Sequence, residues 1–203
     1  METEEEPRDL RARNKQTTRQ AISTAALRLA VEQGPAGLKL VRVADIASAA
    51  GVSPRTYNNY FSSREEAICA VHADQARRLG RTLLARPAGE PLAEAVAASV
   101  VECFATPEPD RVGLAMIMSA SELQGEALKA FTMAEEPLAA ALAERTGAGP
   151  RDDLACQVMA GAIAAAVRVA GQYWLGTTER VAFADVLREA LRYAVPAEHP
   201  GGS

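Results

Sequence analysis

The sequence is poor in the residues that build disulfide frameworks and large aromatic cores. Its 203 residues include four Phe, four Tyr, one Trp, three Cys and two His. The cysteines, Cys69, Cys103 and Cys156, are odd in number, far apart and part of no CxxC motif. That pattern argues against a disulfide-stabilised fold and suits a reducing compartment.

Sequence motifs for catalysis are also missing. His72 and His199 are the only histidines, so no Ser/His/Asp triad is expected, and no glycine-rich phosphate-binding loop occurs. Cys69 and His72 have the i, i+3 spacing of two metal ligands on one helix face, but no second close pair accompanies them. We read both as packing residues and expect no enzyme activity, metal or cofactor.

Long apolar runs are absent too. The longest charge-free apolar stretch, residues 154–167, is 14 residues long, whereas a membrane-spanning helix needs about 20. Four glutamates lie among residues 1–6, the opposite of the basic start of a signal peptide. We therefore expect a cytoplasmic protein that does not span a membrane.

Alanine, by contrast, is abundant: 43 of the 203 residues are Ala. Alanine is the strongest helix former and is depleted in strands, so the composition predicts an all-α protein. Folding a chain of this length buries roughly 70% of its unfolded surface, enough for a core without disulfides or metal.

Charge is divided unevenly along the chain. Residues 7–86 contain 14 Lys and Arg against 6 Asp and Glu, whereas residues 87–203 contain 8 against 16. The overall charge of -4 therefore conceals a basic first part followed by an acidic remainder. This asymmetry indicates a polyanionic partner for the first part alone.

The basic part begins with an amphipathic helical pattern. Its expected start is Thr17, in capping-box spacing with Gln20, and Gly34-Pro35 is expected to end it. Residues 1–16 are expected to form a flexible, partly basic arm that follows the DNA backbone or a minor groove.

Two short helices with a tight turn are expected next. The first covers residues 43–50 and ends at Gly51, in the left-handed conformation. The second is capped by Ser53 and has Pro54 at its first position. Such a pair forms a helix-turn-helix, with Tyr57 and Phe61 directed inward.

The outward face of the second short helix carries groups suited to DNA. Arg55, Asn58 and Asn59 lie at i, i+3 and i+4, and their side chains can hydrogen-bond guanine and adenine edges in the major groove. Thr56 and Tyr60 lie on an adjacent stripe that suits phosphates. Structural or solvated roles for these residues are the alternative at each position.

The run VADIASAAGVSPRTYNNYFSSREEAI, preceded by TRQAISTAALRLAVEQG, resembles the DNA-binding region of the tetracycline-repressor (TetR) family of bacterial transcriptional regulators. The resemblance covers residues 17 to about 68. It implies an N-terminal DNA-binding domain, residues 17–62, and a C-terminal domain, residues 63–195, that binds a small molecule and forms a homodimer. Residues 196–203 are expected to be a flexible tail.

Three positions depart from the family pattern. Arg42 stands where the family usually has a threonine cap, and it can itself reach a phosphate. Asn58 stands where the family commonly has a phosphate-contacting tyrosine, and Tyr57 occupies the position usually filled by leucine. Arg64 replaces a lysine of the family. Arg64 is expected near a DNA phosphate at the start of the next helix. The expected DNA-binding residues are Arg42, Ser53, Pro54, Arg55, Thr56, Asn58, Asn59, Tyr60 and Arg64.

Six further helices are expected after the helix-turn-helix. Their approximate ranges are 64–86, 92–105, 110–120, 122–145, 151–175 and 179–194, with a kink or break at Pro137. The helix over 151–175 is apolar or small nearly all round, so its surface must be shared between its own subunit and something else. The resemblance implies that the last two helices form the dimer interface.

The resemblance also implies a ligand cavity in the C-terminal bundle. Methionine and aromatic side chains adapt to bulky apolar ligands, and the expected wall residues are Phe104, Met116, Met118, Phe131, Met133 and Trp174. Plain core packing is the alternative for each. Arg168 interrupts an apolar helix, so it is expected to pair with a carboxylate across the dimer, to reach solvent by snorkelling, or to bind an acidic ligand group.

Together these features predict a homodimeric transcriptional regulator, a repressor that a small molecule releases from a palindromic operator. The alternative is a helical ligand carrier or protein-interaction module with non-specific affinity for DNA.

Overall fold

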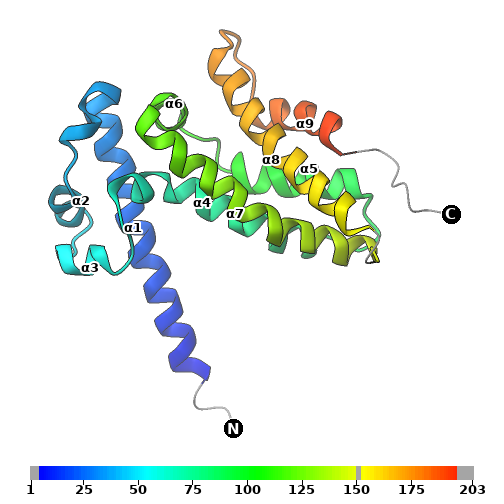
Figure 1. Ribbon diagram of the computed structural model, residues 1–203, viewed down its shortest axis with the longest axis horizontal. Helices are drawn as coiled ribbons and strands as arrows, with labels where there is room; N and C mark the ends of the chain where they lie inside the picture. Colours follow the sequence, from blue (N-terminus) through cyan, green and yellow to red (C-terminus); the bar gives the residue numbers. More distant parts are fainter. Residues whose placement is uncertain (1–4, 150–151, 196–203) are drawn as a thin grey trace.

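The computed structural model describes residues 5–149 and 152–195, and all regular elements in these ranges are helical (Figure 1). The order is α1 (Glu5–Gly37), the short 3-10 helix η1 (Leu38–Leu40), α2 (Val43–Ala49), α3 (Pro54–Asn58), α4 (Arg64–Leu84), α5 (Leu92–Phe104), α6 (Arg111–Ser119), α7 (Ser121–Thr146), α8 (Asp153–Gly176) and α9 (Phe183–Ala194). The all-α prediction is confirmed. The expected tail lies outside the described residues.

Helix α1 begins at Glu5, twelve residues before its predicted start, so the prediction of a flexible arm over residues 5–16 was wrong. Thr17 does not cap a helix, because its hydroxyl donates to the Arg13 carbonyl within α1 at 2.9 Å. The segment consists mostly of strong helix formers, and acidic residues at its start complement the helix dipole. The extra turns project from the molecule beside α3 (Figure 1).

The other end of α1 agrees with the prediction. Its helical geometry is interrupted at Gly34, where φ is 69° and ψ is 172°. Glycine adopts this conformation without the steric cost of a Cβ. The break turns the chain toward α2.

Helices α2 and α3 form the predicted helix-turn-helix. Gly51 has φ 68°, the left-handed conformation expected after α2. The Ser53 hydroxyl accepts a 3.0 Å hydrogen bond from the Thr56 amide, and Pro54 is the first residue of α3. Ala47 is fully buried, which allows the two short helices to approach each other closely.

The buried side chains form two clusters. One lies within α1, α2, α3 and the first turns of α4, and we call this part the head. The other lies within α4, α5, α7, α8 and α9, and we call this part the bundle. Helix α6 contributes to both, since Met116 and Ile117 belong to the head cluster and Leu114 to the bundle cluster.

Within the bundle, α7 runs through Pro137 without ending, so the break proposed there does not occur. A Cβ built on Gly80 of α4 would lie 3.0 Å from the Pro137 carbonyl oxygen. The glycine therefore lets the two helices touch at the proline, and packing along α4 supports the helix there.

Helix α8 has two apolar faces. Its inner face is buried against α7 and α9, whereas Leu154, Val158, Val169 and Tyr173 are exposed on its outer face. Within the described residues, α8 is the single helix with the length and apolar composition to cross a membrane, and 44% of that window is buried in the protein. The outer face of α8 is exposed in the single chain.

Candidate DNA-binding head and ligand cavity

The solvent face of α3 carries the predicted base-reading residues. Arg55, Asn58 and Asn59 are all exposed, and no hydrogen bond or ion pair within the described residues engages their side chains. They come from one short helix at one end of the molecule, next to the projecting part of α1 (Figure 1). A guanidinium and two carboxamides are thus free to meet base edges.

The supporting residues of α3 are more engaged. Ser53 and Thr56 share a 2.8 Å hydrogen bond between their hydroxyl groups, and Thr56 is half-buried. Tyr60 is half-buried and packs against the head cluster, while Pro54 is exposed. These residues hold the helix while leaving an edge for phosphate contacts.

Tyr57 and Phe61 are directed inward, as predicted, with 1% and 2% of their surfaces exposed. The Tyr57 hydroxyl donates a 2.8 Å hydrogen bond to the Ser63 carbonyl. The phenolic oxygen is therefore paired, although this position is usually a leucine in the family pattern. Burial raises the pKa of Tyr57 to about 12, so the phenol stays protonated. The two rings fix α3 against the start of α4.

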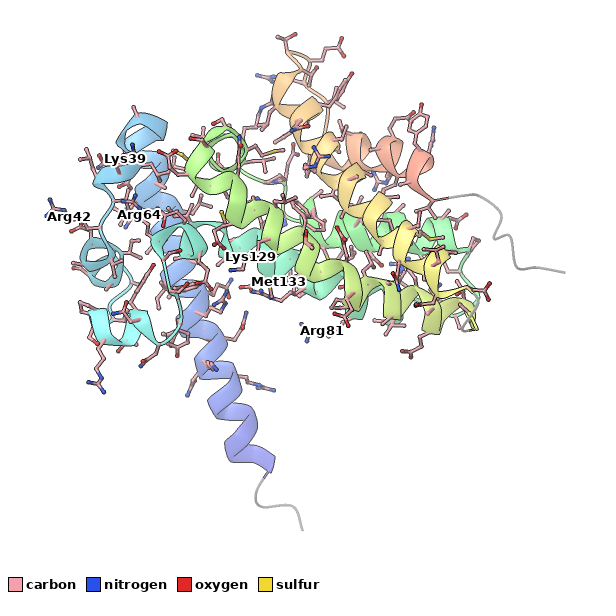
Figure 2. The ribbon with its side chains drawn as sticks, in the orientation of Figure 1. Lys39, Arg42, Arg64, Arg81, Lys129 and Met133 are labelled. Carbon is pink, nitrogen blue, oxygen red and sulfur yellow. The ribbon has the colours of Figure 1, made fainter. Side chains whose placement is uncertain are left out.

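Arg64 does not have the free position expected of a phosphate contact. Its Nη1 donates to the carbonyls of Lys39 and Val41 at 3.0 and 3.1 Å, and its Nε donates to Glu65 at 2.6 Å. Figure 2 shows Arg64 between the η1 region and α4. The guanidinium therefore ties the loop before α2 to α4, because main-chain carbonyls there lack helical partners.

Arg42, by contrast, is exposed and extends away from the body of the head (Figure 2). It lies at the N-cap position of α2 but makes no capping hydrogen bond there, because a guanidinium cannot accept a hydrogen bond from a main-chain amide. Its charge remains available to a phosphate at the same end of the molecule as α3.

Arg19 is a positioning residue that the sequence reading missed. Its Nη1 donates to the Tyr60 carbonyl at 3.2 Å, its Cζ lies 4.3 Å from the Phe61 ring centre, and its Nε is 3.6 Å from Asp74. One guanidinium thus joins α1, the end of α3 and α4. The position of Arg19 three residues before the buried Ile22 indicated that it lies near the buried side of α1. Nothing local in the sequence indicated its distant partners.

Part of the basic charge in residues 7–86 lies beyond the head. Arg77 pairs with Asp74, and the Arg86 Nε donates to Glu90 at 2.8 Å. Arg81 is exposed on the bundle (Figure 2). Within the head, Arg42 and Arg55 are exposed, and no ion pair among the described residues engages them.

The bundle contains a cavity of about 390 Å³, within the range of small-molecule sites. Its walls come from α4, α6, α7 and α8, with Phe104 at the end of α5 and Phe183 at the start of α9. Most of the lining is apolar, and the polar members are Cys69, His72, Gln75, Gln124, Arg168 and Gln172. None of the carboxylates in residues 5–149 and 152–195 lines it.

Four of the seven expected ligand residues line this cavity: Phe104, Met118, Phe131 and Arg168. The other three are placed elsewhere. Met116 is buried in the head cluster, and Met133 is 57% exposed on the outside of α7, in line with Lys129 (Figure 2). Helical periodicity alone did not separate these positions from the lining residues.

Trp174 lies behind the cavity wall. Its ring centre is 5.1 Å from that of Phe183, which does line the cavity, and its Nε1 donates to the Val181 carbonyl at 2.8 Å. Arg111 of α6 covers the other side, with its Cζ 4.4 Å from the ring centre and its Nη2 2.7 Å from the Trp174 carbonyl. The start of α6 is therefore attached to the end of α8.

Arg168 is exposed at the cavity, not enclosed in the bundle as its apolar surroundings indicated. It lies near the edge of the outer face of α8, and no ion pair within the described residues involves it. Its charge is solvated in the single chain, so an internal carboxylate partner is not needed.

Cys69 and His72 both line the cavity. No group of three potential ligands comes together within the described residues. Burial raises the pKa of the Cys69 thiol to about 12, and the thiol donates to the Leu123 carbonyl at 3.8 Å. Burial lowers the pKa of His72 to about 4, so its ring is neutral near pH 7.

Comparison with known proteins gives two family matches. Residues 22–68 match the family described as bacterial regulatory proteins of the tetR family, and residues 90–198 match the family described as the MftR C-terminal domain. A solved structure from Shewanella sp. PV-4, titled "putative tetR family transcription regulator", has a TM-score of 0.52 and 19% identity over 87% of this chain and 95% of that chain. No curated protein matches.

Proposed function

The chain belongs to the tetR family of bacterial regulatory proteins, and on that premise we propose that it is a homodimeric repressor released from DNA by a small molecule. The observation that carries the proposal is the free side of α3, where Arg55, Asn58 and Asn59 are exposed while Tyr57 anchors the helix from behind. Such a helix can enter a major groove without unfolding any part of the head.

The DNA contacts divide into two kinds. Arg55, Asn58 and Asn59 are proposed to read base edges, and Arg42 together with the edge of α3 is proposed to position the head on phosphates. The projecting turns of α1 extend the same end of the molecule, so this helix is proposed to follow the DNA backbone as a helix. Arg64 supports the head through its carbonyl contacts.

Two heads are needed because one recognition helix reads only a few base pairs. The outer face of α8 is proposed as the centre of a twofold interface, with Leu154 and Tyr173 exposed by 71% and 65% in the single chain. Gly161 and Ala165 lie on the same side of the helix and permit close helix packing. The outer side of α9 carries the pairs Arg188–Asp185 and Arg192–Glu189, which suit an interface rim.

The direct test is the selection of bound duplexes from a random pool by the full-length protein. We expect an inverted repeat whose half-sites lie on successive major-groove faces. Recovery of single, unpaired half-sites would contradict the dimer, and recovery of no common sequence would contradict the reading role of α3.

Salt dependence separates the regulator from a helical ligand carrier with non-specific affinity for DNA. A regulator binds its selected duplex and a random duplex more weakly as salt increases, but keeps a large ratio between them, in the range of 10³ to 10⁷ typical of specific binding. Equal affinities at every salt concentration would favour the carrier.

Coupling between the cavity and the head is proposed to run through α6. Leu114 and Met118 line the cavity, whereas Ile117 both lines it and belongs to the head cluster with Met116. A Cβ built on Gly113 would lie 3.6 Å from Leu27 of α1. A ligand that displaces α6 therefore acts on α1. A coupling of about 1 to 3 kcal/mol between ligand and operator binding is typical.

The role of Arg168 is decided by replacement with Met. Loss of dimerisation with unchanged effector affinity would assign it to a partner subunit's carboxylate, and the reverse result would assign it to an acidic group of the ligand. Size-exclusion chromatography with light scattering measures the first property, and titration calorimetry the second.

A further inference from the structure

The cavity wall formed by α4 contains a histidine ring without a hydrogen-bond partner. His72 lines the cavity, its Nδ1 is shielded from solvent, and no hydrogen bond within the described residues engages the ring. Within the described residues the only other such buried side-chain atom is the Ser99 hydroxyl, which does not line the cavity. Polar groups inside proteins are nearly always paired, so an imidazole ring without a partner in the wall of a ligand-sized cavity needs an explanation.

The chemistry of His72 limits what can pair with it. Its neutral ring offers one N–H donor and one lone-pair acceptor. No carboxylate from the described part of the chain lines the cavity, so none of these acids is placed where it would favour imidazolium. A neutral imidazole in an apolar wall is complemented by an uncharged group that donates or accepts one hydrogen bond.

A second polar group lies on the same wall. Gln75 is three residues after His72 on α4 and also lines the cavity. Its carboxamide both donates and accepts, so it suits the same kind of uncharged group. Among the described residues, Arg168 is the only charged one in the lining; it is exposed and belongs to α8, as does the uncharged Gln172. The charge is therefore on a different helix from His72 and Gln75.

Building on the ligand role proposed for this cavity, we propose that its ligand is a mainly apolar molecule whose uncharged hydroxyl or carbonyl group hydrogen-bonds to His72. The apolar walls bind the body of the molecule, and His72 fixes its orientation. A ligand without the polar group leaves the imidazole unpaired in an enclosed site. Sites with a buried hydrogen-bonding group discriminate against such analogues.

The test compares three probes of similar size: 1-hexanol, 1-chlorohexane and hexanoate. Each is titrated into the full-length protein and followed by the fluorescence of Trp174, the single tryptophan, whose ring packs on the cavity residue Phe183. Because the chloroalkane is the more hydrophobic probe, the informative quantity is the ratio of hexanol affinity to chlorohexane affinity and its change on mutation.

In His72→Leu we expect this ratio to fall about tenfold relative to wild type, because only the alcohol loses a hydrogen bond. Phe131→Leu is the matched control, since it alters an apolar wall residue and should weaken both probes alike. A change of less than twofold in His72→Leu would overturn the proposal. Hexanoate binding tighter than hexanol, sensitive to Arg168→Met and insensitive to His72→Leu, would also overturn it.

A second measurement uses the native ring. His199→Gln leaves His72 as the only histidine, so the ¹⁵N resonances of its imidazole can be assigned directly. We expect 1-hexanol, but not 1-chlorohexane, to shift them as a hydrogen bond forms, and equal shifts with both probes would contradict the proposal. Neither measurement uses DNA, so a failed regulator and a failed His72 contact are distinguished. Failure of all three probes to bind would overturn the ligand role of the cavity itself, and this inference with it.

Discussion

The head and the bundle use the same kinds of apolar residue but differ in how much of their structure is local. In the head, the Ser53 cap lies three residues from its partner Thr56, and the Gly51 turn lies between the two helices it joins. Where the head meets the bundle, apolar side chains of the same helix have different surroundings. Met116 of α6 is buried in the head, whereas Met118, two residues later, lines the cavity. Function in the bundle therefore depends on contacts distant in sequence.

The strongest way to test this contrast is to remove the anchor of α3. Tyr57→Ala should lower the free energy of unfolding by about 3 to 5 kcal/mol, since it deletes an almost fully buried ring. Met133→Ala, at an exposed methionine of the bundle, should change it by less than about 0.5 kcal/mol. Denaturant unfolding of both variants measures the difference.

Tyr57→Phe separates the ring from its hydroxyl. This variant should lower the free energy of unfolding by about 1 kcal/mol, because it loses the hydrogen bond to the Ser63 carbonyl. Equal costs for Tyr57→Ala and Met133→Ala would show that the head is no more tightly specified than the outer surface of the bundle.

His72 should make the bundle sensitive to acid. Its pKa is about 4 in the folded protein and 6.5 when unperturbed, so the unfolded chain binds a proton there that the folded chain does not. The contribution of the neutral His72 ring to the free energy of unfolding is fully present above pH 6.5 and is lost as the pH falls toward 4. We expect a loss of roughly 3 kcal/mol over this range. Unfolding free energies measured at several pH values should show a weaker dependence in His72→Leu. An identical dependence in both proteins would contradict the buried neutral ring.

Within the head, base reading and positioning should respond differently to mutation. Arg55→Ala should relax base preference at one operator position, by about 1 to 3 kcal/mol of discrimination. Arg42→Ala should weaken binding to all duplexes alike and reduce the salt slope by about one. Binding to a set of singly substituted operators at several salt concentrations measures both effects. Identical behaviour of the two variants would remove the division between these residues.

The smallest expected effect concerns the shape of the cavity. A Cβ built on Gly171 would lie 3.1 Å from the Met118 sulfur, the flexible end of a cavity residue. Gly171→Ala should therefore push Met118 into the cavity and weaken ligand binding, with less than about 1 kcal/mol of change in stability. Gly125→Ala is the matched control, because no atom lies within 4 Å of its built Cβ. Equal ligand affinity in both variants would place the binding site elsewhere.

Much of the head was predictable because its signals are short-range. The capping of α3, the left-handed Gly51 and the inward Tyr57 and Phe61 all follow from neighbouring residues. The start of α1 was not predicted, because Thr17 has the residue type of a cap but donates to a carbonyl within a longer helix. Cap residues remain ambiguous when strong helix formers precede them.

The candidate sites were predicted less evenly. Arg55 and the two asparagines are exposed, as their pattern on α3 required. The carbonyl contacts of Arg64, however, reach residues more than twenty positions away, so no local pattern indicated them. Phe104, Met118 and Phe131 line the cavity whereas Met116 and Met133 do not, although all five are aromatic or methionine side chains suited to an apolar ligand.

The amino-acid sequence by itself determined the helical class, the short capped helices of the head and the outward polar face of α3, because these depend on propensity, periodicity and hydrogen bonds between near neighbours. Only the tertiary structure decided that α6 serves both clusters, that Arg64 binds main-chain carbonyls, and that His72 faces a cavity without a partner. Those outcomes depend on which helices pack together, and an apolar or cationic side chain does not encode its distant neighbour.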